Sequence, residues 1–177
     1  MRKFAIGAIL LVVFLFLLFL QVNIFPVFPI AGIVPNLFVI FVVFIGLFTN
    51  TSYGVGFGVF IGLVLDGLYG TRIGVTAVML AIVGFVGAYF DKNFSKDSKI
   101  TIIIMIALST ILFEFGKYVL TAAIVGYQFE WLNFVRILLI ETLYNVLLSI
   151  IFYPLIKKAG FGIDRVFKKT NLLTRYF

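Results

Sequence analysis

The sequence predicts an all-α integral membrane protein with six transmembrane helices and both termini in the cytoplasm. The first observation is composition, because 63% of the 177 residues are hydrophobic and only 12% are charged. Mean hydropathy is +1.23. A soluble domain of this length could not bury so much apolar surface, whereas a bilayer can. The other observations are the recurrence of long apolar runs and the uneven distribution of basic residues between the segments that join them.

Six apolar runs come close to the roughly 20 residues that a helix needs to cross the hydrocarbon core. The expected spans are residues 4–20, 33–49, 53–70, 73–90, 100–125 and 134–156. The first follows Met1-Arg2-Lys3 and resembles a signal peptide. Its apolar run is too long, however, and no small-x-small cleavage site follows, so we expect a retained helix.

The segments between the spans are mostly short. Residues 21–34 form an apolar loop that we expect to lie against the membrane surface or partly re-enter it, and Pro35 is expected in the first turn of the second span. Residues 50–52 and 70–72 have the composition of tight turns. Residues 91–99 are the hydrophilic loop of the chain interior.

The distribution of basic residues predicts orientation. With six spans, both termini share one side with the loops at 50–52 and 91–99, and this side holds eleven of the fourteen lysines and arginines. Arg72 and Arg136 fall on the other side, and Lys117 lies within a span. Because positive residues stay cytoplasmic, the termini are expected in the cytoplasm of a multi-pass protein of the cell membrane. The net charge of +7 then reflects topology and anionic lipid, and nucleic acid is not an expected partner.

Residues 157–177 are expected to form a separate basic tail behind the transmembrane domain of residues 1–156. On a helical wheel, apolar Ile163, Val166 and Phe167 share one arc, which is typical of an amphipathic helix on the inner membrane surface. A solvated tail that only enforces topology and a docking helix for a cytoplasmic partner are the alternatives. The basic residues of this inner-surface tail are Lys157, Lys158, Arg165, Lys168, Lys169 and Arg175.

A ladder of small residues crosses the third span and carries one acid. Its members are Gly54, Gly58, Gly62, Asp66, Gly70 and Gly74. Glycines four apart let a neighbouring helix approach closely. A carboxylate within a membrane helix costs a few kcal/mol or more, so Asp66 is expected to face protein or water. We therefore expect this face to pack against helices, either of this chain or of a partner.

A second group of polar residues lies inside the spans. Asp66, Glu114, Lys117, Glu141 and Asn145 all fall in the outer half of the membrane or near its midplane, at about 1.5 Å of helix rise per residue. Similar depths make the pairs Lys117–Glu141 and Glu114–Asn145 plausible between the fifth and sixth spans. Two interpretations remain open: polar contacts that hold the helices in register, and an outward-open pocket for a ligand or for a partner's charged group.

The sequence contains no catalytic or metal-binding pattern. Cysteine and histidine are absent, which excludes disulfides, thiol chemistry and the usual His/Cys metal sites. Gly54-Val-Gly-Phe-Gly lies on an apolar helix with no strand before it, so helix packing explains it better than a phosphate loop. We expect no enzyme activity, no cofactor and no metal.

These motifs resemble the MreD family, the small membrane subunit of the bacterial rod-shape machinery. The matching residues are Pro35-Asn36-Leu37, where the family usually has Pro-Asp-Leu, then Gly58-x-x-x-Gly62-Leu63-x-x-Asp66-x-x-x-Gly70-x-x-x-Gly74, Glu114, Leu143-Tyr144-Asn145 and Pro154. The family is also similar to the substrate-binding subunits of energy-coupling-factor transporters, which implies a related six-helix fold.

The resemblance implies a non-enzymatic scaffold in lateral peptidoglycan synthesis. Its implied partners are MreC, bound through helix faces, then MreB, RodA and a class B penicillin-binding transpeptidase. The alternative is a substrate-binding subunit of an energy-coupling-factor vitamin transporter, which would need a ligand-complementary outer pocket. An ion path through Asp66, Glu114 and Glu141 is disfavoured, because the acids do not continue into the cytoplasmic half.

Overall fold

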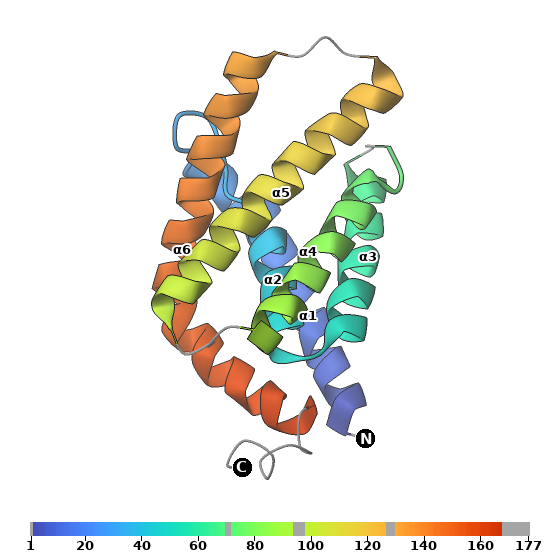
Figure 1. Cartoon of the computed structure of the whole chain (residues 1–177), viewed down its shortest axis with the longest axis vertical. Helices are drawn as coiled ribbons and strands as arrows, with labels where there is room; N and C mark the ends of the chain where they lie inside the picture. The colour runs from blue at the N-terminus through green and yellow to red at the C-terminus, as the bar shows by residue number, and fades with distance from the viewer. Residues whose placement is uncertain (1, 70–71, 94–97, 127–129, 168–177) are drawn as a thin grey trace.

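A computed structural model of the chain describes residues 2–69, 72–93, 98–126 and 130–167. These residues form an α-helical bundle, with a single short 3-10 helix, η1, in the first loop (Figure 1). Between Ile30 and Ile33 the same loop has an isolated β-bridge. The elements are α1 (Arg2–Asn23), η1 (Phe25–Val27), α2 (Leu37–Phe48), α3 (Thr51–Leu68), α4 (Val75–Asn93), α5 (Lys99–Val125) and α6 (Trp131–Phe167).

The six expected helices are all present, but they differ in length. Four of them, α1, α3, α5 and α6, are long and apolar enough to cross a membrane. Helix α2 has 12 residues, or about 18 Å at 1.5 Å per residue, which is less than the roughly 30 Å of a hydrocarbon core. The expected span 33–49 therefore began too early, because residues 33–36 precede the helix.

Polar side chains define where three of the helices begin. The Asn36 side chain accepts a hydrogen bond from the Val39 amide at 3.3 Å, and the Asn50 side chain accepts one from the Tyr53 amide at 2.9 Å. Ser98 caps α5 in the same way. Such caps satisfy amide groups that have no partner within the helix. Two expectations were consequently wrong: Pro35 precedes the cap of α2 rather than lying in its first turn, and residues 51 and 52 belong to α3.

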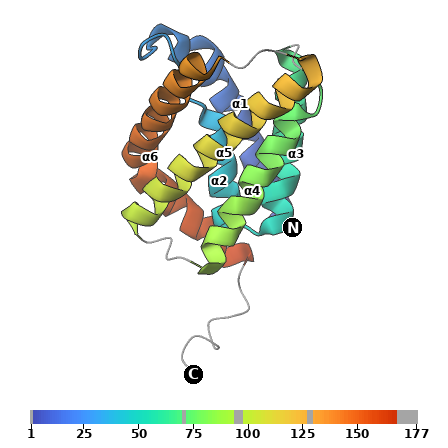
Figure 2. The same ribbon diagram turned by 45° about the horizontal axis from the view of Figure 1, so that its top comes forward.

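Helix α2 is the centre of the bundle. Eleven of its residues are buried, and it contacts α1, α3, α4, α5 and α6. Figure 2 shows it enclosed by the other helices. A helix that is apolar on all sides is stable in this position, because every face meets protein.

The small-residue ladder on α3 packs against α4 of the same chain. A Cβ atom built on Gly62 would collide with the backbone of Ala77, and one on Gly58 would collide with the Leu80 carbonyl. At Gly54 the obstacle is the backbone of Gly84. The α3–α4 contact is the most extensive in the bundle. The glycines thus allow two helix backbones of one chain to touch, and Gly70, a further member of the ladder, lies outside the described residues.

Helix α1 is packed least tightly among the four long helices. Only 17% of its most apolar stretch is buried, against 33% for α3 and α5. Leu10 and Phe14 reach the core, whereas Val12 and Phe16 are more than half exposed. This helix therefore presents most of its surface to lipid or to a partner.

Helix α6 continues to Phe167, well past the expected end of the last span at residue 156. It contains Pro154, and Figure 1 shows its final turns running across the end of the bundle. Proline removes a helical hydrogen bond and bends the axis. Gly160 lies against the Phe48 ring, and the Phe167 ring packs edge-on against Tyr53 with centroids 4.6 Å apart.

The described part of the expected tail is thus helical and joined to α6 without a break. Ile163, Val166 and Phe167 are half-buried, while Arg165 is exposed and Lys157 and Lys158 precede it on the same helix. Lys168, Lys169 and Arg175 lie outside the described residues. The division at residue 156 does not coincide with the end of any element.

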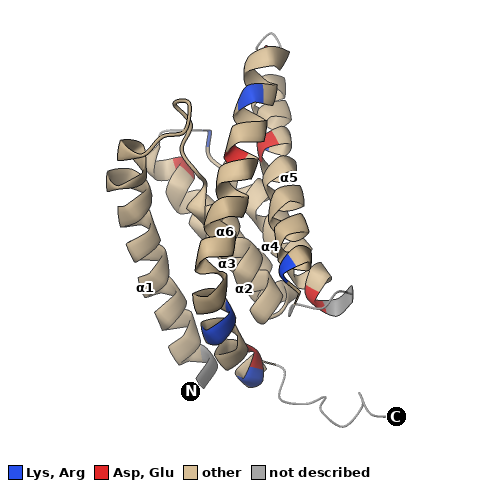
Figure 3. Cartoon of the chain, turned by 90° about the vertical axis from the view of Figure 1, so that its left-hand side faces the viewer, with Lys and Arg blue, Asp and Glu red and all other residues tan. Residues whose placement is uncertain are grey.

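The described chain begins and ends at the same end of the bundle (Figure 1). Basic and acidic residues both lie near this end, and further acidic residues lie higher, two of them on α5 and α6 (Figure 3). The α1–α2 loop, the end of α5 and the start of α6 lie at the opposite end (Figure 2).

The glycine contact predicts a sharp difference between two Gly→Ala substitutions on α3. Gly62→Ala should lower the free energy of unfolding by about 1–3 kcal/mol, because the methyl group meets backbone that cannot move aside easily. Gly67→Ala is the control, since its Cβ would enter open space; it should be neutral or stabilising by up to about 1 kcal/mol. Thermal unfolding of the purified protein, followed by circular dichroism, measures both. Equal midpoints for the two variants would contradict the packing.

Candidate functional site

Asp66 caps the start of α4. It is 1% exposed, and its Oδ2 accepts hydrogen bonds from the Gly74 amide at 2.8 Å and the Ala77 amide at 3.4 Å. Its Oδ1 accepts one from the Thr76 amide at 3.2 Å. The amides at a helix N-terminus carry partial positive charge, so they stabilise a carboxylate there. Gly74 completes this turn with φ of 103°, in the left-handed region that favours glycine.

This arrangement separates Asp66 from the other members of the expected polar cluster. Its neighbours Leu65 and Thr76 line the pocket described below, but Asp66 is not among the lining residues. Its oxygens face the backbone of α4 instead. The expected juxtaposition with Glu114 and Glu141 is therefore not found, because the sequence does not reveal that α4 begins beside this carboxylate.

Asn145 ties α6 to the start of α2 and to α5. It is fully buried, and its Oδ1 accepts a hydrogen bond from the Asn36 amide at 2.8 Å. Its Nδ2 donates to Thr110 Oγ1 at 3.1 Å. Asn145 thus uses both polar atoms in contacts other than the expected pair with Glu114. The depth of the residue in the bundle was predictable, but its partners were not.

Gln21 is a further contributor that the sequence analysis did not identify. Its Nε2 donates to the Pro35 carbonyl at 2.8 Å, and its Oε1 accepts from the Leu37 amide at 3.1 Å. The side chain therefore joins the end of α1 to the start of α2. An amide at the end of an otherwise apolar run was the available signal.

The loop between α1 and α2 folds back onto α6. Arg136 donates from an Nη to the Ala31 carbonyl at 3.1 Å, and the Tyr144 hydroxyl donates to the Phe28 carbonyl at 2.9 Å. Ala31 and Gly32 both have positive φ, which turns the chain sharply. The loop is consequently held against the bundle, beside the residues that form the pocket.

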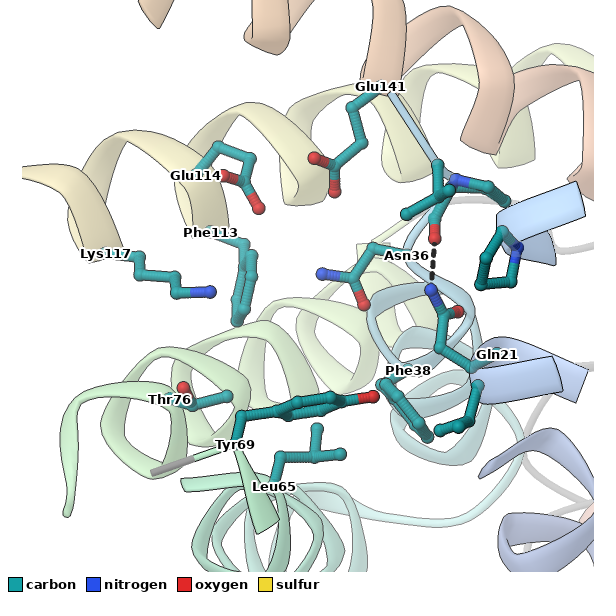
Figure 4. A pocket seen from close by; sticks show the side chains of 14 residues that line it. Gln21, Asn36, Phe38, Leu65, Tyr69, Thr76, Phe113, Glu114, Lys117 and Glu141 are labelled. Carbon is teal, nitrogen blue, oxygen red and sulfur yellow. Dashed lines mark hydrogen bonds between the residues drawn. The ribbon is translucent and has the colours of Figure 1, made fainter. Parts of the chain in front are cut away.

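A pocket of about 460 Å³ opens above the start of α2, between α5, α6 and the first loop (Figure 4). Its volume lies within the range usual for small-molecule sites. Its lining is polar on one side and apolar on the other. The lining residues are Gln21, Val22, Pro26, Val34, Pro35, Asn36, Phe38, Leu65, Tyr69, Thr76, Phe113, Glu114, Lys117 and Glu141.

Three of the expected cluster residues meet at this pocket. The carboxyl groups of Glu114 and Glu141 come from different helices and face one another closely enough to interact. The Lys117 ammonium lies 5.6 Å from the centre of the Phe113 ring. Within the described part of the chain it makes no ion pair with either glutamate, so the expected Lys117–Glu141 bridge is not formed.

Glu141 is the most constrained of these groups. The residue is 7% exposed, and its Oε1 is enclosed without a hydrogen-bond partner among the described residues. Burying such a carboxyl oxygen costs free energy, because it has lost its hydrogen bonds to water and has gained no protein donor in their place. The pocket wall therefore has an unsatisfied acceptor.

The site offers polar groups that can bind a ligand. Two carboxyl groups and one amine are among its lining residues. Among the described residues, no group of three acidic side chains is placed to hold a metal ion. The described residues form a bundle of helices, four of them long and apolar enough to cross a membrane, with a polar pocket near the end of the bundle remote from Arg2 and Phe167.

The sequence profile of the family described as rod shape-determining protein MreD matches residues 1–159. The chain belongs to the MreD family, and it is therefore a membrane protein with a role in determining rod shape. No curated protein and no solved structure matched the chain significantly. The similarity to transporter substrate-binding subunits accordingly stays a prediction.

The capping geometry predicts that Asp66 is needed for folding. Asp66→Ala should lower the unfolding free energy by at least about 1–2 kcal/mol, because the amides at the start of α4 lose their acceptor. Glu130→Ala is a matched control, since Glu130 is an exposed acid whose carboxylate, among the described residues, accepts from the Asn133 side chain. Thermal unfolding in detergent measures both variants. Unchanged stability of Asp66→Ala would contradict the cap.

Proposed function

We propose that the chain is a non-enzymatic scaffold subunit of the bacterial cell-elongation complex that binds MreC through its membrane-embedded helices. Family membership supports the role in rod shape. The description of the family as shape-determining also supports a role without catalysis. MreB, RodA and a class B transpeptidase are the further proposed members of the complex.

The face that binds MreC must differ from the small-residue ladder of α3, because α4 already covers that ladder. The observation that carries the proposal is a second groove, of about 430 Å³, between α1 and α3. It is lined by Leu11, Ser52, Tyr53, Gly56, Phe57 and Phe60. Apart from Ser52 and the Tyr53 hydroxyl, these side chains are apolar.

Small residues at the centre of this groove suit a helix. Ser52 and Gly56 are four apart on α3 and both are exposed, and a Cβ on Gly56 would have no atom within 4 Å. Close approach of backbones is a main source of helix association in lipid. The sparse packing of α1 leaves the groove open along its length. We infer that the transmembrane helix of MreC lies here.

The basic residues favour placing both termini in the cytoplasm. Lys157, Lys158 and Arg165 lie on the part of α6 that crosses the end of the bundle where the described chain begins. The pocket would then open toward the outside of the cell membrane.

The native chain has no cysteine, so single-cysteine variants can test the groove directly. A cysteine at position 56 should crosslink to a cysteine in the MreC transmembrane helix. Ile104→Cys is the matched control, because Ile104 is exposed and lies on α5, six residues into its helix as Gly56 is in α3. Equal crosslinking at both positions, or none at 56 in a complex that purifies intact, would reject this face. Normal rods after depletion of the protein would reject the function itself.

The same approach tests orientation. A membrane-impermeant maleimide should label Leu132→Cys in intact cells, because Leu132 is 90% exposed at the end remote from the termini. Arg165→Cys should react only after the cells are opened. The reverse pattern would contradict a cytoplasmic location of the termini.

A further inference from the structure

The polar wall of the pocket above α2 carries more acid than base. Glu114 projects from α5, Glu141 from α6 and Asn36 from the start of α2, and all three approach one another in Figure 4. Lys117 is the one cationic side chain among the lining residues. Since it forms no ion pair with the two carboxyl groups, the wall has a surplus of hydrogen-bond acceptors.

The unsatisfied oxygen of Glu141 indicates which chemistry would complement this wall. A buried acceptor is stabilised by a donor, and by a cationic donor most strongly. An ammonium group is compact and has three donors, so it can serve two carboxyl groups from different helices at once. An anionic ligand would bring further acceptors to a wall that has few donors, so the wall would not complement it.

The rest of the pocket suits an apolar body. Phe38 and Leu65 lie across from the acids, and Phe113 extends from α5 beside Glu114. The end of α1 adds Val22, and the first loop adds Val34. A ligand that is charged at one end and aliphatic at the other would cover both surfaces. Sites for small molecules commonly combine apolar walls with a few placed polar groups.

We propose that this pocket binds a primary ammonium group carried on an apolar body, with Glu141 and Glu114 as its acceptors. Two sources share this chemistry: a free alkylamine, and the headgroup of an aminophospholipid such as phosphatidylethanolamine. The proposal is independent of MreC, because the α1–α3 groove and the pocket share no lining residue.

The test uses the full-length protein in nanodiscs made of phosphatidylglycerol and phosphatidylcholine, which contain no primary amine. Hexylamine is titrated by calorimetry, with hexanol and hexanoate as analogues of equal length and with empty nanodiscs as the blank. Hexylamine should bind saturably, with one site per chain and at least about tenfold more tightly than hexanol. Hexanoate should not bind. The absence of saturable hexylamine binding, or equal affinity for hexanol, would overturn the proposal.

Variants identify the acceptor. Glu141→Gln should weaken hexylamine binding by at least about tenfold, because an amide cannot form the charge-assisted hydrogen bond that a carboxylate forms with an ammonium group. Glu130→Gln is the control, since Glu130 is exposed and is not a lining residue; its affinity should stay within about twofold, as expected for a screened surface charge. Hexylamine affinity of Glu141→Gln equal to that of the native chain would overturn the proposal.

Lys117→Gln provides a test that does not rely on the folding of Glu141→Gln. Removing the competing cation should tighten hexylamine binding by about threefold or more. Unchanged or weaker binding would contradict the assignment of the acids as acceptors.

A second series of nanodiscs distinguishes the two sources. If the headgroup of phosphatidylethanolamine occupies the pocket, adding this lipid should weaken hexylamine binding by competition, and replacing it with its N-trimethylated analogue should restore the binding. If hexylamine affinity is the same in both membranes, the free amine is the ligand class.

Discussion

The structure depends on hydrogen-bond acceptors for the first backbone amides of helices that begin inside the protein. A helix leaves its first amide groups without partners, and water is not available in a bilayer to take their place. Helix α2 begins partway into the bundle, and Asn145, Gln21 and Asn36 supply acceptors for the Asn36, Leu37 and Val39 amides. Helix α4 begins beside Asp66, which accepts from three amides. The intramembrane polar residues are thus largely the means by which the short central helix and its neighbour are held in place.

This constraint divides the polar residues into two groups with different tasks. Asp66 and Asn145 are saturated by backbone and by Thr110, so they stabilise the fold. Glu114, Lys117 and Glu141 lie next to the capped start of α2, where the shortness of that helix leaves a pocket. Of the two interpretations that the sequence left open, helix register applies to Asp66 and Asn145, and the ligand site that we propose involves the other three residues. The glycines act on the other side of α2, where they bring α3 and α4 together.

Features that follow from the local pattern of residues could be predicted from the sequence alone. Apolar runs predicted six helices, and the spacing of Gly58, Gly62 and Asp66 predicted a close helix contact and the MreD family, which the profile match to residues 1–159 confirms. Features that arise from contacts between helices were harder to predict from the sequence. Periodicity could not reveal that Asn145 meets Asn36, that Asp66 meets α4, or that the partner of the glycine ladder belongs to the same chain. The unbroken continuation of α6 past residue 156 was also missed, since two lysines normally mark the end of a span.

Hydrogen exchange of the protein in nanodiscs tests the role of the caps most directly. The amides of residues 36, 37 and 39 and of residues 74, 76 and 77 should exchange slowly in the native chain, because side chains accept their hydrogen bonds. Asn145→Ala should speed exchange at residues 36–39 and leave residues 74–77 protected, and Asp66→Ala should do the opposite. If both segments keep their native protection in both variants, or if both are unprotected in the native chain, side-chain capping does not hold these helices in place.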